Sequence, residues 1–399
     1  MPAYKILIVD DIENNRFTLD IMLSVLGKFD VEEAESGPEA LEKLNQTTYD
    51  LVLLDIMMPG MTGIEVLEKL DLATSSLNTK FIVVSALQDM EIIVKALELG
   101  ALDYLPKPIE EALLAARLKQ LLERRETDEE LRKNKERIDS DLKKAADIQK
   151  SLCPEQTLSF KSLSGEICCE LAGSMQPAYE VGGDFYDYFE LPDGNIVVVI
   201  ADACGKGAPA AIYASRVHDL LRMVALHNAS EAKSSSEESL LTMLTAVNTI
   251  LSENNDACWF VTTWAGIYSP EDRVLTWCSA GHCDALLQNP DNSVEPLSIE
   301  TGLPIGLDET FSAKVDTRVL PLGSKLHLYT DGITEHRKDD GGFVGEDGLI
   351  QLFEQLATKT LSIEDNVKAL THSVLGMNSM QPPEDDITLL SLSVVDTNT

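Results

Sequence analysis

The 399-residue sequence has few basic residues: Lys and Arg number 32 against 67 Asp and Glu, so the formal net charge is −35. So acidic a surface repels the phosphates of nucleic acids and of anionic lipids, and we expect neither nucleic acid nor membrane as a partner. The sequence also lacks an apolar run of the roughly 20 residues that span a bilayer. Its start, MPAYKILIVDD, goes straight into a strand pattern without a signal peptide, so we expect a cytoplasmic protein.

Paired cysteine motifs are missing as well. The seven cysteines are scattered, with one adjacent pair (Cys168, Cys169) and no C-x-x-C spacing, which argues against a disulfide framework and against a zinc site. The chain is 44% hydrophobic, enough for two ordinary globular domains with their own cores. A mainly disordered chain is excluded.

Residues 1–112 alternate continuous apolar runs (KILIV, DLVLLDI, KFIVVSA) with helical patterns. Strands that are apolar throughout and alternate with helices are typical of a parallel sheet covered on both faces. This segment is therefore predicted to be a doubly wound α/β domain.

Residues 113–152 are predicted to form a helical linker, because they contain no Gly or Pro and carry dense, mixed charge. Apolar residues recur every seven positions in one row and, with interruptions by charged residues, in a companion row. The first row is Leu131, Ile138, Ala145 and Leu152, and the companion row is Leu114, Leu121, Leu142 and Gln149. The pattern favours a coiled coil, and a single solvated helix is the alternative.

Residues 153–399 mix strand and helix patterns with Gly-rich turns, as an α+β domain does. The strand-like runs include NIVVVIA, WFVTTWAGIY, VLTWCSAG, KLHLYTDG and DITLLSLSVV. From residue 154 onward the chain has 37 acidic and 13 basic residues, so much of the acidity lies here.

Five polar side chains of the first domain follow or end its strands. They are Asp10, Asp11, Asp55, Ser85 and Lys107. Doubly wound folds place their sites at the carboxyl ends of the strands. Three carboxylates there repel one another unless a hard cation such as Mg²⁺ lies among them, and one can then accept a phosphoryl group. An acid that merely ends a strand explains any one of these residues but not five.

These residues and the motifs VDD, LLDIMMPGMTG, VVSA and KP resemble the response-regulator receiver family across nearly all of residues 1–112. The resemblance implies a flavodoxin-like fold with Asp55 as phosphoacceptor and Mg²⁺ held by Asp10, Asp11, Asp55 and the Met57 carbonyl. It further implies that Ser85 and Lys107 contact the phosphoryl group and that Tyr104 is an aromatic switch. The phosphoryl group would come from a sensor histidine kinase or another phosphodonor.

Four acidic motifs mark the second domain: EVGGDFYD, IADACGKG, LYTDGITE and PEDDITLL. They contain Asp184, Asp202, Asp331, Asp385 and Asp386. An acid beside Gly is more often simply a turn. Widely separated acids at strand ends can, however, converge on two metal ions, which lower the pKa of a water molecule and hold a phosphate.

Together these motifs resemble the metal-dependent serine/threonine phosphatases of the 2C type, in the bacterial branch that controls sporulation and stress sigma factors. The resemblance covers roughly residues 145–395, with SAGH and GLPIGL as supporting motifs. It implies a layered αββα sandwich with two Mn²⁺ or Mg²⁺ ions. Asp202 would bridge them with help from the Ala203 carbonyl, and Asp184, Asp331 and Asp385 would complete the metal ligands. Asp386 would only orient its neighbour.

Some positions depart from the family pattern. Cys204 stands where Ser is frequent in the family, and Cys283 stands where Pro is common. No His follows Asp202 directly, so the group that protonates the leaving oxygen of the substrate is unassigned. Lys206 either contacts substrate phosphate or, as we favour, points to solvent beside the site. For His282 a structural role is favoured over a catalytic one.

The sequence thus predicts a response regulator with a receiver (1–112), a helical and dimerising linker (113–152) and a phosphatase domain (153–399). Its substrate would be a phosphoserine or phosphothreonine protein, which the resemblance suggests is an anti-sigma factor antagonist. The alternative is a catalytically inactive adaptor with the same fold that binds a sigma factor or its regulator. Such an adaptor should have lost metal-ligand carboxylates, whereas all four are present here.

Overall fold

A computed structural model of the protein describes residues 4–70, 79–86, 90–154, 156–161, 167–231, 235–253, 255–359, 361–378 and 382–395. The chain divides into two compact units, Met1–Lys135 and Glu136–Thr399. None of the helices in these ranges has both the length and the apolar character needed to cross a membrane.

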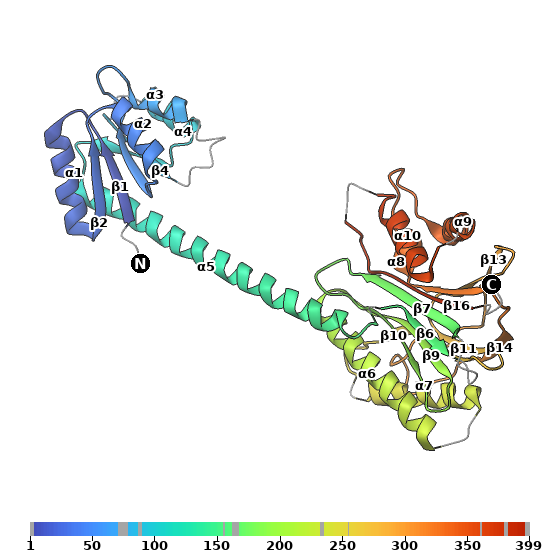
Figure 1. Cartoon of the computed structure of the whole chain (residues 1–399). Coiled ribbons are helices and arrows are strands. Elements are labelled where there is room, and N and C mark those ends of the chain that lie inside the picture. The colour runs from blue at the N-terminus through green and yellow to red at the C-terminus, as the bar shows by residue number, and fades with distance from the viewer. Residues whose placement is uncertain are drawn as a thin grey trace. The chain divides into compact units, whose positions relative to one another are not determined.

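The first unit contains a five-stranded parallel sheet with the order β2-β1-β3-β4-β5 (Figure 1). Its elements are β1 (Tyr4–Val9), α1 (Glu13–Leu26), β2 (Phe29–Ala34), α2 (Gly37–Gln46), β3 (Leu51–Asp55), α3 (Gly63–Leu70), β4 (Lys80–Ala86), α4 (Met90–Glu98), β5 (Asp103–Lys107) and the start of α5 (Glu111–Lys150). Alternate strand residues face two separate cores: Ile6 and Ile8 pack with α1 and α5, whereas Leu7 and Val9 pack with α2 and α3. The predicted doubly wound, flavodoxin-like fold is confirmed.

Helix α5 is continuous from Glu111 to Lys150, as the absence of Gly and Pro predicts. The companion heptad row is wrong at three positions. Leu114 and Leu121 are buried in the core of the first unit, and Gln149 is buried in the second. Leu131 and Ile138 of the other row are 62% and 58% exposed, so an apolar seam remains in the middle of the helix.

The second unit contains two antiparallel sheets, β14-β11-β10-β9-β8 and β13-β12-β15-β16-β7-β6. Its strands are β6 (Leu158–Lys161), β7 (Ile167–Gln176), β8 (Asp184–Glu190), β9 (Ile196–Ala203), β10 (Val261–Ser269), β11 (Val274–Ala280), β12 (Ala285–Gln288), β13 (Val294–Leu297), β14 (Asp316–Val319), β15 (Lys325–Tyr329) and β16 (Ile387–Val394). Its helices are α6 (Ala208–Glu231), α7 (Ser236–Ser252), α8 (Asp331–Thr334), α9 (Gly345–Ala357) and α10 (Ile363–Leu375).

The two sheets lie between two helix layers (Figure 1). Helices α6 and α7 cover the sheet that contains β8 and β9, and α10 covers the sheet that contains β7 and β16. One large apolar core joins α6, α7 and both sheets, and a second core lies under α9 and α10. The predicted αββα sandwich is confirmed.

Candidate functional site

The first candidate site lies at the carboxyl end of the parallel sheet. Carboxylate oxygens of Asp10, Asp11 and Asp55 lie within 4.8 Å of one another. The Lys107 ammonium nitrogen is 2.8 Å from an Asp55 oxygen and 3.0 Å from an Asp10 oxygen. Parallel strands end at the same edge, so residues that are almost a hundred positions apart meet here.

Burial raises the pKa of Asp55, while the bonded Lys107 lowers it and the charge of Asp10 raises it again. Burial lowers the pKa of Lys107, but its hydrogen bonds to Asp55 and Asp10 outweigh that effect and raise it. Three carboxylates beside one ammonium remain an anionic group. Their hard oxygen donors fit a cation such as Mg²⁺.

The other predicted receiver residues lie on β4 and β5 or follow β3. Ser85 is buried in β4, which pairs with β3, the strand that ends at Asp55. The backbone nitrogen of Met57 is 3.4 Å from an Asp55 oxygen, and its side chain is exposed. Tyr104 is half-buried in β5. The roles assigned to these residues remain predictions.

The second candidate site lies where strands of both sheets of the second unit begin or end. Asp184 begins β8 and stands opposite Asp202 of β9 in the antiparallel register. Asp331 follows β15, and Asp385 shortly precedes β16, which pairs with β15. Pairing within each sheet joins Asp184 to Asp202 and the end of β15 to the start of β16. Hydrogen bonds from Thr330 to the Asp184 carboxylate and from the Asp184 nitrogen to Asp386 link the two sheets, so acids up to 201 positions apart in the sequence lie in one region.

These acids are held in an environment that opposes their charge. Burial raises the pKa of Asp202 most, and the charges of Asp331 and Asp385 raise it further, to about 7. Burial and then the charge of Asp202 raise the pKa of Asp184 well above 3.8. Mg²⁺ and Mn²⁺ prefer oxygen donors. The four carboxylates and the Ala203 carbonyl next to Asp202 are such donors, so the site fits divalent cations.

Asp386 positions the loop before β8. Its carboxylate accepts hydrogen bonds from the backbone nitrogens of Ala178 (2.8 Å), Gly183 (2.6 Å) and Asp184 (3.2 Å). A Cβ at Gly182 would lie 2.1 Å from an Asp386 oxygen, so only glycine fits there. The orienting role predicted for Asp386 agrees with this geometry, although the loop it orients is that of Asp184.

Two threonines that the sequence analysis missed hold Asp184. The Thr330 and Thr388 hydroxyls donate to one Asp184 oxygen at 2.7 Å and 2.5 Å. Thr330 directly precedes Asp331 in the motif LYTDG, and Thr388 follows Asp386 by two positions in the motif DDITLL. Position within these motifs was the signal that could have identified them.

The structure contradicts the solvent-facing position that we favoured for Lys206 and agrees with the structural role that we favoured for His282. The Lys206 ammonium does not simply point to solvent, because it is 2.8 Å from an Asp385 oxygen.

The His282 ring is buried between the Thr262 hydroxyl (2.8 Å) and the Tyr329 carbonyl (3.1 Å), and burial lowers its pKa to about 4. A neutral ring with both nitrogens bonded supports the structural role that we favoured.

Gln149, near the end of α5, contacts the loop that precedes Asp184. Its amide donates to the Gly182 carbonyl (2.6 Å) and accepts from the Gly182 nitrogen (3.1 Å), and both residues are buried. The linker helix is thus bonded to a residue two positions before a predicted metal ligand. This contact is the physical reason that Gln149 cannot belong to a coiled-coil seam.

We predict that Gln149→Met lowers the melting temperature of the protein by several degrees. Methionine keeps the shape but leaves the Gly182 nitrogen and carbonyl buried without partners, each at a cost of roughly 1–3 kcal/mol. Gln351→Met on the exposed face of α9 is the matched control. Equal melting curves for the two variants, measured by circular dichroism, would show that the Gln149 contact contributes nothing to stability.

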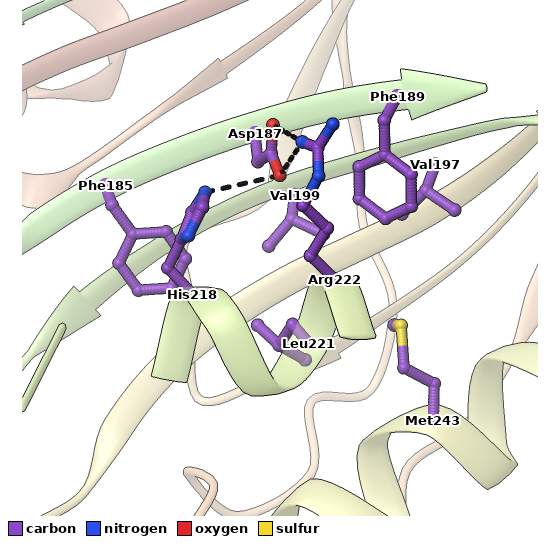
Figure 2. Close-up of a pocket in the computed structure, with 9 residues that line it drawn as sticks. All are labelled: Phe185, Asp187, Phe189, Val197, Val199, His218, Leu221, Arg222 and Met243. Carbon is purple, nitrogen blue, oxygen red and sulfur yellow. Dashed lines mark hydrogen bonds and ion pairs between the residues drawn. The ribbon is translucent and has the colours of Figure 1, made fainter. Parts of the chain in front are cut away.

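A small pocket between α6, α7 and β8 contains a charged triad (Figure 2). Asp187 of β8 is buried and contacts Arg222 (2.7 Å) and His218 (3.3 Å), which are four residues apart on α6. The rest of the lining is apolar. The triad fastens α6, which follows the Asp202 loop, to the strand that begins with Asp184.

We predict that the pKa of His218 lies above the ordinary value of a histidine. Burial lowers its pKa, but the hydrogen bond and charge of Asp187 outweigh burial and raise it above 6.5. The stability that the charged ring contributes is therefore complete below pH 6.5 and is lost as the pH rises through the folded-state pKa. An NMR titration of the His218 ring should show the raised pKa, and Asp187→Asn should lower it. An unshifted midpoint in that variant would contradict the assignment.

Comparison with known proteins agrees with both units. Residues 192–395 match the family described as Stage II sporulation protein E, and residues 6–119 match the response regulator receiver domain. The chain is similar to Phosphoserine phosphatase RsbU of Bacillus subtilis (strain 168), with 28% identity over 266 residues, 66% of this chain and 72% of RsbU. It is also similar to the Transcriptional regulatory protein CpxR homolog of Haemophilus influenzae, with 43% identity over 120 residues, 30% of this chain and 51% of that protein.

Among solved structures, the SiaA-PP2C domain of Pseudomonas aeruginosa is similar, with a TM-score of 0.52 and 19% identity. The match covers 65% of this chain and 98% of that domain. At this identity the likeness shows the fold of the second unit alone.

Proposed function

The chain belongs to the Stage II sporulation protein E family, and we propose that it is a response regulator whose receiver controls a metal-dependent protein serine/threonine phosphatase. The observation that carries the proposal is the meeting of Asp184, Asp202, Asp331 and Asp385 at strand ends in one unit, joined by one helix to a receiver. The similarity to RsbU supports phosphoserine as the substrate residue.

In the proposed reaction a water molecule attacks the phosphorus of a phosphoserine or phosphothreonine, the phosphorus–oxygen bond to the side chain breaks, and inorganic phosphate and the free side-chain hydroxyl are the products. Two divalent cations, Mn²⁺ or Mg²⁺, would neutralise the phosphate and acidify the water. Asp202, with help from the Ala203 carbonyl, would be the ligand shared by the two cations, and Asp184, Asp331 and Asp385 would complete the ligand set. Thr330 and Thr388 fix the orientation of Asp184, while Asp386 fixes the loop that carries it.

The receiver would take its phosphoryl group from a sensor histidine kinase onto Asp55. Asp10, Asp11 and the Met57 carbonyl would hold Mg²⁺ with Asp55, and Lys107 would neutralise the transferred charge. The resemblance to sigma-factor regulators suggests an anti-sigma factor antagonist as the substrate of the phosphatase. Both reactions would take place in the cytoplasm.

The rival proposal, an inactive adaptor, predicts that no phosphoprotein changes when the protein is removed. Quantitative phosphoproteomics on cells with and without the protein separates the two, with the Asp202→Asn variant reintroduced as the matched control. We expect one or a few phosphoserine or phosphothreonine sites to rise on removal, and only the wild type to reverse the rise. Unchanged phosphorylation throughout would favour the adaptor.

We further predict that the protein is a dimer through parallel pairing of α5. Leu131 and Ile138 are exposed apolar residues seven positions apart, and pairing would bury them. Replacing both with Glu should convert the dimer to a monomer in light scattering, whereas Lys133→Glu, also on α5, should not. A wild-type monomer at all accessible concentrations would support the solvated single helix instead.

A further inference from the structure

Lys206 connects two of the acidic motifs. It lies in the loop between β9 and α6, where Gly205 and Gly207 adopt φ angles of 91° and 69°, which favour glycine. From there its ammonium donates to the Glu384 carbonyl at 2.6 Å and contacts an Asp385 oxygen at 2.8 Å. The loop that follows Asp202 therefore places the positive charge of Lys206 beside Asp385, which we assign as a metal ligand.

Both oxygens of Asp385 already have partners. One accepts the backbone nitrogen of Asp386 at 2.9 Å, and the other is the oxygen that Lys206 contacts. The backbone nitrogen is fixed by the chain immediately before β16. The Lys206 side chain is 47% exposed and has a flexible four-carbon stem, so Lys206 is the partner that can leave.

We propose that Lys206 is a built-in counter-ion that neutralises Asp385 until a divalent cation binds there, and that the cation must displace it. This inference rests on the proposed function. An ammonium and a divalent cation that contact one carboxylate repel each other at short range, so the two occupants exclude each other. Among the 13 basic residues after residue 153, Lys206 is thereby assigned a part in metal binding.

The displaced ammonium would remain near the site, because backbone hydrogen bonds hold its loop on both sides: the Cys204 nitrogen donates to the Phe260 carbonyl, and the Ala211 nitrogen donates to the Gly207 carbonyl. It would then be free to neutralise the phosphate of the substrate. Lys206 would thus be a positioning residue for Asp385 before the cation binds and a phosphate contact afterwards. The two roles predict opposite effects of removing its charge: metal ions should bind more tightly and phosphoprotein more weakly.

Calorimetric titration of the full-length protein with Mn²⁺ tests the first effect. All proteins carry Asp10→Asn and Asp11→Asn, which remove receiver carboxylates and leave the heat of binding to the phosphatase unit. Lys206→Met removes the charge and keeps the stem, and Lys206→Arg keeps the charge. Lys314→Met is the matched control, since Lys314 is an exposed lysine paired with Glu300.

The Mn²⁺ dissociation constant should fall about three- to fivefold in Lys206→Met, a range appropriate to a partly exposed ion pair. It should stay within a factor of two in Lys206→Arg and Lys314→Met. At saturating Mn²⁺, KM for a phosphoprotein should rise in Lys206→Met more than kcat falls. An unchanged or weaker Mn²⁺ affinity in Lys206→Met would overturn the counter-ion role. If no protein bound Mn²⁺, the proposed metal-dependent function would itself be overturned.

Discussion

Hydrolysis of a phosphoprotein by the Asp202→Asn variant should be at least about 100-fold slower than by the wild type, at saturating Mn²⁺. The substitution removes one carboxylate charge and almost no volume. Because Asp202 is the proposed bridging ligand, both cation positions would be weakened at once. The measurement is phosphate release from one phosphoserine protein, with and without chelator.

The fold of this variant should survive, which separates loss of chemistry from loss of structure. Burial and the charges of Asp331 and Asp385 already disfavour the ionised carboxyl of Asp202. In chelator the melting temperature of Asp202→Asn should therefore equal or exceed that of the wild type. The rise in melting temperature that Mn²⁺ gives the wild type should disappear in the variant.

Asp291→Asn, in the exposed loop between β12 and β13, is the matched control and should behave as wild type in both measurements. Wild-type turnover by Asp202→Asn, or full wild-type turnover in chelator, would eliminate metal-dependent hydrolysis at this site. An inactive variant that also melts early would instead assign Asp202 a structural role.

The parts of the fold that could be predicted are those whose sequence pattern is local. The strands around Ile6, Leu53 and Ile82 are apolar on both faces, so a covered parallel sheet was readable without any tertiary knowledge. The meeting of the receiver acids could be predicted because all parallel strands of a sheet end at the same edge. Family motifs supplied the acids of the phosphatase.

The parts that could not be predicted depend on partners far away in the sequence. Strand β8 carries a buried Asp187, and its charge is balanced by His218 and Arg222. Gln149 fits a heptad row by spacing, yet its partner is the backbone of Gly182. The ion pair between Lys206 and Asp385 likewise joins residues 179 positions apart, and no local pattern indicates it.

Phosphorylation of Asp55 should increase phosphatase turnover by tens- to hundreds-fold, which corresponds to a coupling of a few kcal/mol. The new phosphoryl group would add negative charge where Lys107 already contacts Asp55 and Asp10. Ser85 and Lys107 would move toward it and Tyr104 could change rotamer, so the end of β5 should repack.

The route from that end of β5 to the second site is covalent. Helix α5 begins at Glu111, four residues after Lys107, and continues without Gly or Pro to Lys150. Near its end Gln149 is bonded to both backbone groups of Gly182, which adjoins the Gly183 nitrogen held by Asp386. A shift or rotation of the helix would therefore reach the loop that carries Asp184.

The experiment compares turnover of one phosphoprotein with and without beryllofluoride, a phosphoryl mimic, in wild type and Asp55→Ala. Activation should occur in the wild type alone, because a phosphatase that answers a signal is most simply held inactive at rest. Adding Gln149→Met should leave the mimic bound to the receiver but reduce the activation, since the bonds to Gly182 are lost. Equal rates in wild type and Asp55→Ala under both conditions would show that the receiver does not control catalysis. A lower rate with the mimic would show that phosphorylation of the receiver inhibits the phosphatase, through the same residues.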